Sequence, residues 1–160
     1  MKALLVVDIQ KGLTLKRQVY NENILIETVN SAIDRYREAG DLVLFVQHNN
    51  KFLKKGEPDW EIDERIHWLK DDRVIQKFHG DAFKKTGLDE TLKEYRIKEI
   101  TVCGLTSHGC VKATCLGALE HGYIVTLLKE GHSNVNKNAK EKILQAERDM
   151  EENGIGFFYV

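Results

Sequence analysis

Three residues of reactive type follow apolar stretches that have the composition of buried strands. Asp8 comes directly after Leu4–Val7, Lys77 comes directly after Val74–Gln76, and Cys110 lies in a turn after a third such stretch. Together a thiol, a carboxyl group and an ammonium group can perform nucleophilic catalysis. The sulfur attacks a carbonyl, the carboxylate takes and returns a proton, and the cation stabilises the charges. This chemistry requires the fold to bring the three side chains together.

Each of the three residues also has a structural interpretation. Asp8 could cap a helix or brace a loop, and Lys77 could be a solvated lysine at a strand edge. Most free cysteines are small buried hydrophobes, and Cys103 and Cys115 fit that description. Cys110 differs because it lies in a polar, small-residue turn at a predicted helix start. A helix N-terminus favours thiolate, and its N–H groups can bind an oxyanion, so a functional role is favoured for Cys110.

Alternating strand and helix patterns supply the elements that must position these residues. The predicted strands are Ala3–Val7, Leu42–Val46, Val74–Lys77, Ile100–Cys103, Tyr123–Leu128 and Gly156–Val160. The predicted helices are Asn23–Ala39, Asp89–Tyr95, His108–His121 and Lys137–Asn153. This α/β alternation with short connections predicts a parallel sheet covered by helices on both faces. In such sheets ligands bind beyond the carboxyl ends of the strands, which is where the three reactive residues are expected.

Composition narrows the classes of protein that the chain can belong to. The 160 residues fit a single domain, residues 1–160, with 42% apolar and 31% charged residues. A net charge of -1 gives no reason to expect a nucleic-acid or membrane partner. Three cysteines are too few for a disulfide scaffold, and no stretch approaches the roughly 20 apolar residues of a membrane span. A cytoplasmic location is therefore predicted.

Several short motifs, in this order, resemble those of the isochorismatase-like cysteine hydrolases, a family that includes nicotinamidases and N-carbamoylsarcosine amidase. Each motif is weak alone, but the ordered set is specific and spans nearly the whole chain. The motifs are Val6–Gln10, Lys77–Phe83 with Thr86–Leu88, Gly104–Val111 with Thr114 and Ala118, and Gly122–Val125.

The resemblance implies a three-layer α/β/α, Rossmann-like fold with a six-stranded parallel sheet. It implies that Asp8, Lys77 and Cys110 form a catalytic triad. It also implies a non-proline cis peptide bond before Thr106, with the N–H groups of Thr106 and Cys110 forming an oxyanion hole. The expected reaction is hydrolysis of an amide or related C–N bond of a small molecule through a thioester. The resemblance further suggests a homo-oligomer.

Two departures from the family pattern bear on the activity. Nicotinamidases carry an Asp-x-His metal motif at the end of the second strand, whereas this chain has Val46, Gln47 and His48 there. Because zinc takes about four ligands, His48 alone makes no metal site, and neither a metal nor another cofactor is predicted. Isochorismatases proper do not use a cysteine nucleophile, so Cys110 argues against their reaction.

The polar stretch between the second and third strands is the predicted source of substrate specificity. Trp60 is predicted to wall the pocket, with His48 and Phe83 as further lining residues, while Trp68 and Trp60 could equally form a satellite core. Three alternatives stay open: a non-catalytic binding domain, a redox-sensing thiol at Cys110, and an isochorismatase-type hydrolase.

Overall fold

The computed structural model describes residues 1–160 and contains one six-stranded sheet in which every neighbouring pair of strands is parallel. The strand order is β3-β2-β1-β4-β5-β6. From β1 the chain adds β2 and β3 on one side and then β4, β5 and β6 on the other, so the direction of winding reverses between β1 and β4. The strands are β1 (Lys2–Val7), β2 (Leu42–His48), β3 (Arg73–Lys77), β4 (Glu99–Leu105), β5 (Ile124–Ser133) and β6 (Gly156–Phe158). The predicted α/β fold with a parallel sheet is confirmed.

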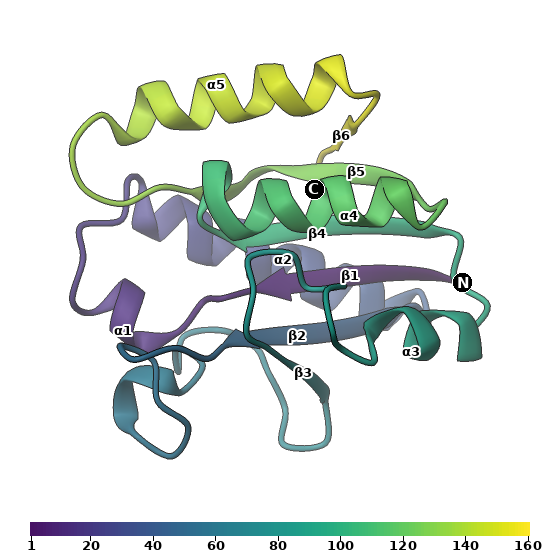
Figure 1. The fold of residues 1–160 in the computed structure, drawn as a ribbon, viewed down its shortest axis with the longest axis horizontal. Helices are drawn as coiled ribbons and strands as arrows, with labels where there is room; N and C mark the ends of the chain where they lie inside the picture. The colour runs from purple at the N-terminus through teal and green to yellow at the C-terminus, as the bar shows by residue number, and fades with distance from the viewer.

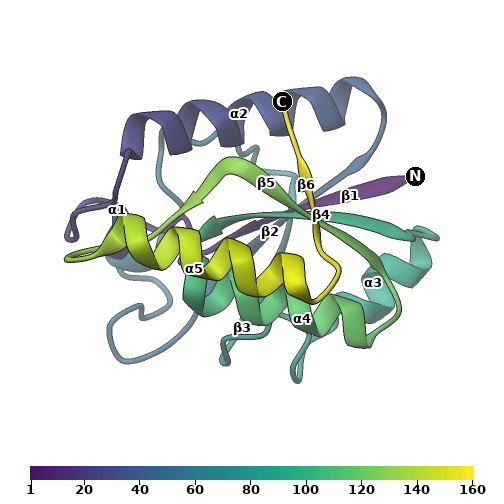
Figure 2. The ribbon, with the colours of Figure 1, turned by 90° about the horizontal axis from the view of Figure 1, so that it is seen from above.

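Helices cover both faces of the sheet and give the molecule three layers (Figures 1 and 2). Helix α2 packs on one face, and α3, α4 and α5 pack on the other. A short helix, α1, follows β1. The helices are α1 (Lys11–Thr14), α2 (Glu22–Glu38), α3 (Leu88–Glu94), α4 (Lys112–Glu120) and α5 (Ala139–Glu152).

Two apolar clusters hold the layers together, one on each side of the sheet. Successive residues of β1 point to opposite faces, so Leu5 and Val7 belong to the α4 side while Leu4 and Val6 belong to the α2 side. Because β1 is central and buried on both faces, its sequence is a continuous apolar run rather than an alternating pattern.

The structure differs from the sequence prediction at two places near the carboxyl edge of the sheet. The helix expected from His108 begins only at Lys112, and a wide turn over Ser107–Val111 precedes it, with non-helical dihedral angles at Gly109. Strand β5 continues to Ser133, beyond an irregularity in its pairing with β4. Periodicity did not reveal either feature, because residue spacing reports neither the backbone break at Gly109 nor the pairing of β5 with β4.

The carboxyl ends of β1, β2, β3 and β4 lie along one edge of the sheet, where the loops that follow them meet (Figure 1). No helix has both the length and the apolar character needed to cross a bilayer.

Candidate active site

Asp8 is the residue that follows β1, at the point where the strand order reverses. Its φ of 54° lies in the left-handed region, which aspartate tolerates better than most residues. The side chain is buried, and its Oδ2 atom lies 3.0 Å from Lys77 Nζ, while Oδ1 has no hydrogen-bond partner. Burial raises the pKa of Asp8, and the Lys77 ammonium opposes that rise. A carboxylate with a raised pKa and a free oxygen is suited to accept a proton.

Lys77 ends β3 and is fully buried, so it is not the solvated edge lysine of the structural alternative. Because β2 lies between β3 and β1, its side chain crosses one strand to reach Asp8. Its ammonium group also lies 3.1 Å from Cys110 Sγ and 3.1 Å from the His79 carbonyl oxygen. A single cation therefore contacts both the carboxylate and the sulfur.

Cys110 is the only one of the three cysteines that is not buried. Burial, followed by the neighbouring Asp8 carboxylate, raises the pKa of its thiol to about 11, and Lys77 acts in the opposite direction. Cys110 lies just before α4, as expected, but burial and the Asp8 carboxylate keep its thiol protonated despite the helix N-terminus and Lys77. The sulfur needs a base to remove its proton, and Asp8 lies within reach.

His48 ends β2, between the strands that carry Asp8 and Lys77. Its Nδ1 atom lies 2.6 Å from Lys77 Nζ, and burial, then Lys77, lowers the pKa of His48 to about 4. The imidazole is thus neutral at pH 7 and accepts a hydrogen bond from the ammonium group. The structure brings this predicted pocket residue directly to the cluster.

The same arrangement bears on metal binding. Ligand atoms of Asp8, His48 and Cys110 all lie within 4.8 Å of one another, a spacing that three metal ligands could have. However, the Lys77 ammonium group contacts all three of these side chains. A cation of the protein itself therefore occupies the space between the donors, which does not fit a bound metal ion.

The turn before Cys110 carries the predicted oxyanion donors. The peptide bond between Leu105 and Thr106 is cis, as the family resemblance implied. The Thr106 carbonyl oxygen accepts hydrogen bonds from the N–H groups of Gly109 and Val111, each at 3.1 Å. These two hydrogen bonds hold the backbone from Thr106 to Val111 in a tight turn.

Trp60 and Trp68 line a cavity that is separate from the triad. Trp60 and Trp68 line a cavity of about 500 Å³ together with Gln47 and Gln76, on the opposite face of β2 and β3 from His48 and Lys77. The lining of that cavity includes none of Asp8, Lys77 and Cys110.

Phe83 lies in the apolar cluster on the α4 side of the sheet. Its ring stacks on His121 with a centroid separation of 4.7 Å and approaches Tyr123 at 5.8 Å. In this structure the contacts of Phe83 are therefore those of a core residue, and its role as a pocket residue stays a prediction.

Gln10 is a site residue to which sequence reasoning gave no role. It is fully buried, its Oε1 atom accepts a hydrogen bond from the His48 N–H, and its Nε2 atom donates to the carbonyl oxygens of His48 and Trp60. It thereby fixes the backbone at His48. The available signal was a polar residue two positions after Asp8, inside the first motif.

Comparison with known proteins identifies a family. Residues 2–151 match the family model described as the isochorismatase domain. An uncharacterized isochorismatase family protein of Bacillus subtilis, YddQ, is 31% identical over 152 residues, which cover 91% of this chain and 84% of that protein.

Two characterised relatives are hydrolases by name. A streptothricin hydrolase of Streptomyces noursei is 31% identical over 83% of this chain, and the match spans 50% of that protein. Nicotinamidase 3 of Arabidopsis thaliana is 27% identical over 89% of this chain and 78% of its own length.

Solved structures share the fold. The crystal structure of an isochorismatase family protein superposes with a TM-score of 0.91 at 27% identity, covering 98% of this chain and 97% of the other. The strand order and the layers described above are therefore common to both molecules.

Proposed function

Because the chain belongs to the isochorismatase family of hydrolases, we propose that it cleaves an amide or related C–N bond of a small molecule through a thioester on Cys110. The observation that carries this proposal is the position of Lys77 Nζ, 3.0 Å from Asp8 Oδ2 and 3.1 Å from Cys110 Sγ in a buried cluster. A carboxylate and a thiol from distant parts of the chain share one cation, in the arrangement that thiol-based hydrolysis needs.

The first half of the reaction forms the thioester. Asp8 removes the proton from Cys110 as the sulfur attacks the substrate carbonyl, and Lys77 stabilises the negative charge. The N–H groups of Thr106 and Cys110 bind the oxyanion of the tetrahedral intermediate. Asp8 then gives its proton to the departing nitrogen, which leaves as an amine or ammonia.

The second half regenerates the enzyme. Asp8, ionised again, removes a proton from a water molecule that attacks the thioester carbonyl, and the same N–H groups bind the second oxyanion. Collapse of this intermediate breaks the C–S bond, releases a carboxylic acid and returns the proton to Cys110. Each proton taken by Asp8 is given back within the cycle.

The thiol chemistry does not favour the redox-sensing alternative. Peroxide-sensing cysteines are exposed and have a lowered pKa, because the thiolate is the form that reacts. The pKa of Cys110 is raised to about 11, and the residue is half-buried. A thiol that needs a neighbouring base to become nucleophilic is suited to a substrate bound beside that base.

The amide class of substrate is supported by the position of Asp8 and by the relatives. An amine is a poor leaving group unless it is protonated, and a carboxyl group with a raised pKa can supply that proton. The named relatives act on nicotinamide and on streptothricin, so these compounds and other small amides form a reasonable substrate panel.

The test combines this panel with a chromogenic ester, p-nitrophenyl acetate, which reports acylation of the sulfur. Wild-type protein should release p-nitrophenolate and gain one acetyl group on Cys110, detectable by mass spectrometry. Cys110→Ala should lose at least about 10³-fold in turnover, because members of a catalytic triad act as a unit. Cys115→Ala, which changes a buried cysteine of the α4 side, should retain activity.

Full activity in the Cys110→Ala protein would disprove the proposed mechanism. Absence of turnover and of acylation in wild-type protein would instead favour the non-catalytic alternative.

A further inference from the structure

A second chain of polar side chains lies beside the site and has no part in the mechanism above. Ser107 Oγ is 2.7 Å from His132 Nδ1, and His132 Nε2 is 3.1 Å from Glu147 Oε2. Ser107 follows Thr106, His132 lies near the end of β5, and Glu147 is on α5. All three residues are buried, with exposed fractions of 0%, 4% and 7%.

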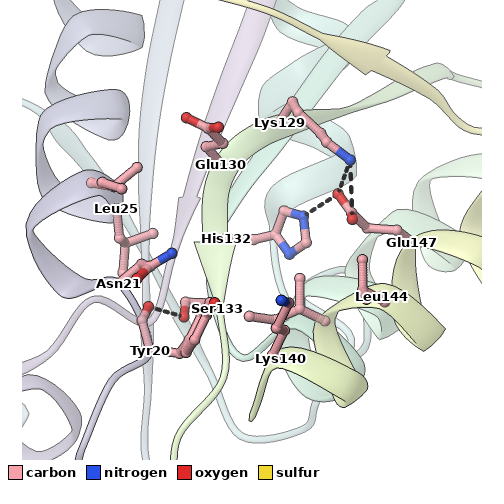
Figure 3. A pocket seen from close by; sticks show the side chains of 12 residues that line it. Tyr20, Asn21, Leu25, Lys129, Glu130, His132, Ser133, Lys140, Leu144 and Glu147 are labelled. Atoms are coloured by element: carbon pink, nitrogen blue, oxygen red, sulfur yellow. Dashed lines mark hydrogen bonds and ion pairs between the residues drawn. The ribbon is translucent and has the colours of Figure 1, made fainter.

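The charge state of Glu147 determines which ring nitrogen of His132 carries a proton. Burial alone would raise its pKa, but hydrogen bonds from His132 and Lys129 outweigh burial and lower the pKa. Figure 3 shows His132 and Lys129 both directed at this carboxylate. An ionised carboxylate only accepts, so Nε2 of His132 carries the proton in the neutral ring and Nδ1 is left as an acceptor. In that neutral form the Ser107 hydroxyl donates to Nδ1.

A serine, a histidine and a carboxylate in sequence resemble a second nucleophilic triad, but the surroundings exclude that use. Ser107 has no exposed surface, so no substrate can reach its hydroxyl. His132 and Glu147 line a cavity of about 200 Å³, and Ser107 is not part of its lining (Figure 3). The hydroxyl faces the protein interior and therefore acts on the protein itself.

The position of Ser107 indicates what this chain of contacts holds. Ser107 lies one peptide unit from Thr106 and at the start of the turn that ends beside Cys110. Its side-chain hydrogen bond ties the turn to β5 and, through Glu147, to α5. A displacement of about 1 Å in such donors is enough to cost a factor of about 10² in rate.

We propose that His132, oriented by Glu147, is a positioning residue that fixes Ser107 and thereby aims the Thr106 and Cys110 N–H groups at the oxyanion. This inference rests on the proposed function. It assigns to the site three residues that contact neither the substrate nor the triad.

Two reagents that attack the same sulfur differently can test the proposal. Acylation by p-nitrophenyl acetate passes through an oxyanion, whereas alkylation by iodoacetamide displaces iodide at a saturated carbon and forms none. Ser107→Ala and His132→Leu should each slow acylation about 10-fold or more while alkylation stays within about twofold. His132→Gln keeps one acceptor and one donor, and it should restore most of the acylation rate.

A double variant and a control variant complete the experiment. The Ser107→Ala/His132→Leu double variant should be no slower than the slower single variant, because the two residues act through one contact. Ser133→Ala is the matched control. It removes a buried hydroxyl from the residue that follows His132, and this hydroxyl donates to the Tyr20 carbonyl oxygen rather than to the turn before Cys110. Both of its rates should equal those of wild type. Protection of Cys103 and Cys115 from iodoacetamide verifies folding in every variant.

Equal slowing of both reagents would overturn the proposal, because the residues would then act on the thiol. Unchanged rates with lowered thermal stability would also overturn it, because the role would be purely structural. Acylation that persists in Cys110→Ala would contradict the proposed function, and this outcome is distinct from the other two.

Discussion

At the scale of single residues, the site depends on one buried cation. The Lys77 ammonium group contacts a carboxylate, an imidazole nitrogen, a sulfur and a carbonyl oxygen. Burying an ammonium group is costly unless such partners replace its water. The ammonium group adds to the effect of burial in lowering the pKa of His48, and it opposes the upward pKa shifts of Asp8 and Cys110.

Replacing Asp8 should separate thiol ionisation from turnover. The Asp8 carboxylate raises the pKa of Cys110, so Asp8→Asn should move the thiolate titration to lower pH, measured by absorbance at 240 nm. Turnover should nevertheless fall about 10²–10⁴-fold, because the acid and base of both half-reactions is lost. Asp149→Asn, which removes a half-buried partner of Lys112 on α5, should change neither quantity. A titration midpoint that rises in Asp8→Asn would contradict this electrostatic interpretation.

At the scale of elements, the approach of β1 to β4 depends on Gly104. Gly104 has φ of +119°, and a Cβ atom there would lie 2.0 Å from the Val7 carbonyl oxygen. Asp8 follows Val7, and the turn that carries Thr106 follows Gly104, so this close contact sets the distance between base and oxyanion donors.

Gly104→Ala should therefore damage both stability and activity. We expect a loss of at least about 2 kcal/mol in unfolding free energy, since alanine suits neither the backbone conformation nor the space. Urea unfolding measures the loss, and turnover of the folded fraction should fall as well. Gly40→Ala also has positive φ but meets nothing within 4 Å, so it separates conformational strain from the clash. Equal losses in the two variants would refute the role given to the clash.

The long connection between β2 and β3 is anchored by Asp63. Its carboxylate accepts hydrogen bonds from the Arg65 backbone and guanidinium group, and its N–H donates to the Ile9 carbonyl oxygen beside Asp8. Burial alone would raise the pKa of Asp63, but hydrogen bonds from Arg65 and Thr14 outweigh burial and lower it to about 2.

This shift predicts how stability depends on pH. The folded pKa is below the unfolded value of about 3.9, so the stabilisation is complete above that value and is lost as the pH falls toward 2. Asp63→Asn should reduce the unfolding free energy by about 2 kcal/mol at pH 7, with the difference vanishing near pH 2. Asp34→Asn, in an exposed pair with His67, should cost less than about 0.5 kcal/mol. A difference that stays constant from pH 7 to pH 2 would exclude this explanation.

At the scale of the whole molecule, the two apolar clusters supply the stability that holds the sheet edge in place. Leu5 is fully buried in the cluster on the α4 side, whereas Leu15 is largely exposed. Leu5→Ala should cost about 2–5 kcal/mol, and Leu15→Ala should stay within about 0.5 kcal/mol. Denaturant unfolding of both proteins measures the difference, and similar losses would contradict the burial described here.

Local pattern indicated the succession of strands and helices and placed Asp8, Lys77 and Cys110 at or after strand ends, while the resemblance of the motifs implied that they form a triad. Apolar runs, helical spacing and strand ends are short-range features, and parallel strands must bring their carboxyl ends to one edge. Ordered motifs then indicated the family, which the comparison with known proteins confirmed.

Only the tertiary structure decided how these residues interact. The crossing of Lys77 over β2, the raised pKa of Cys110, the position of Trp60 on the other face of the sheet and the contacts of His132 all join distant segments. Burial and Coulomb interactions depend on which atoms surround a group in space. Residues separated by tens of positions supply those atoms, so the spacing of residues along the chain does not predict these contacts.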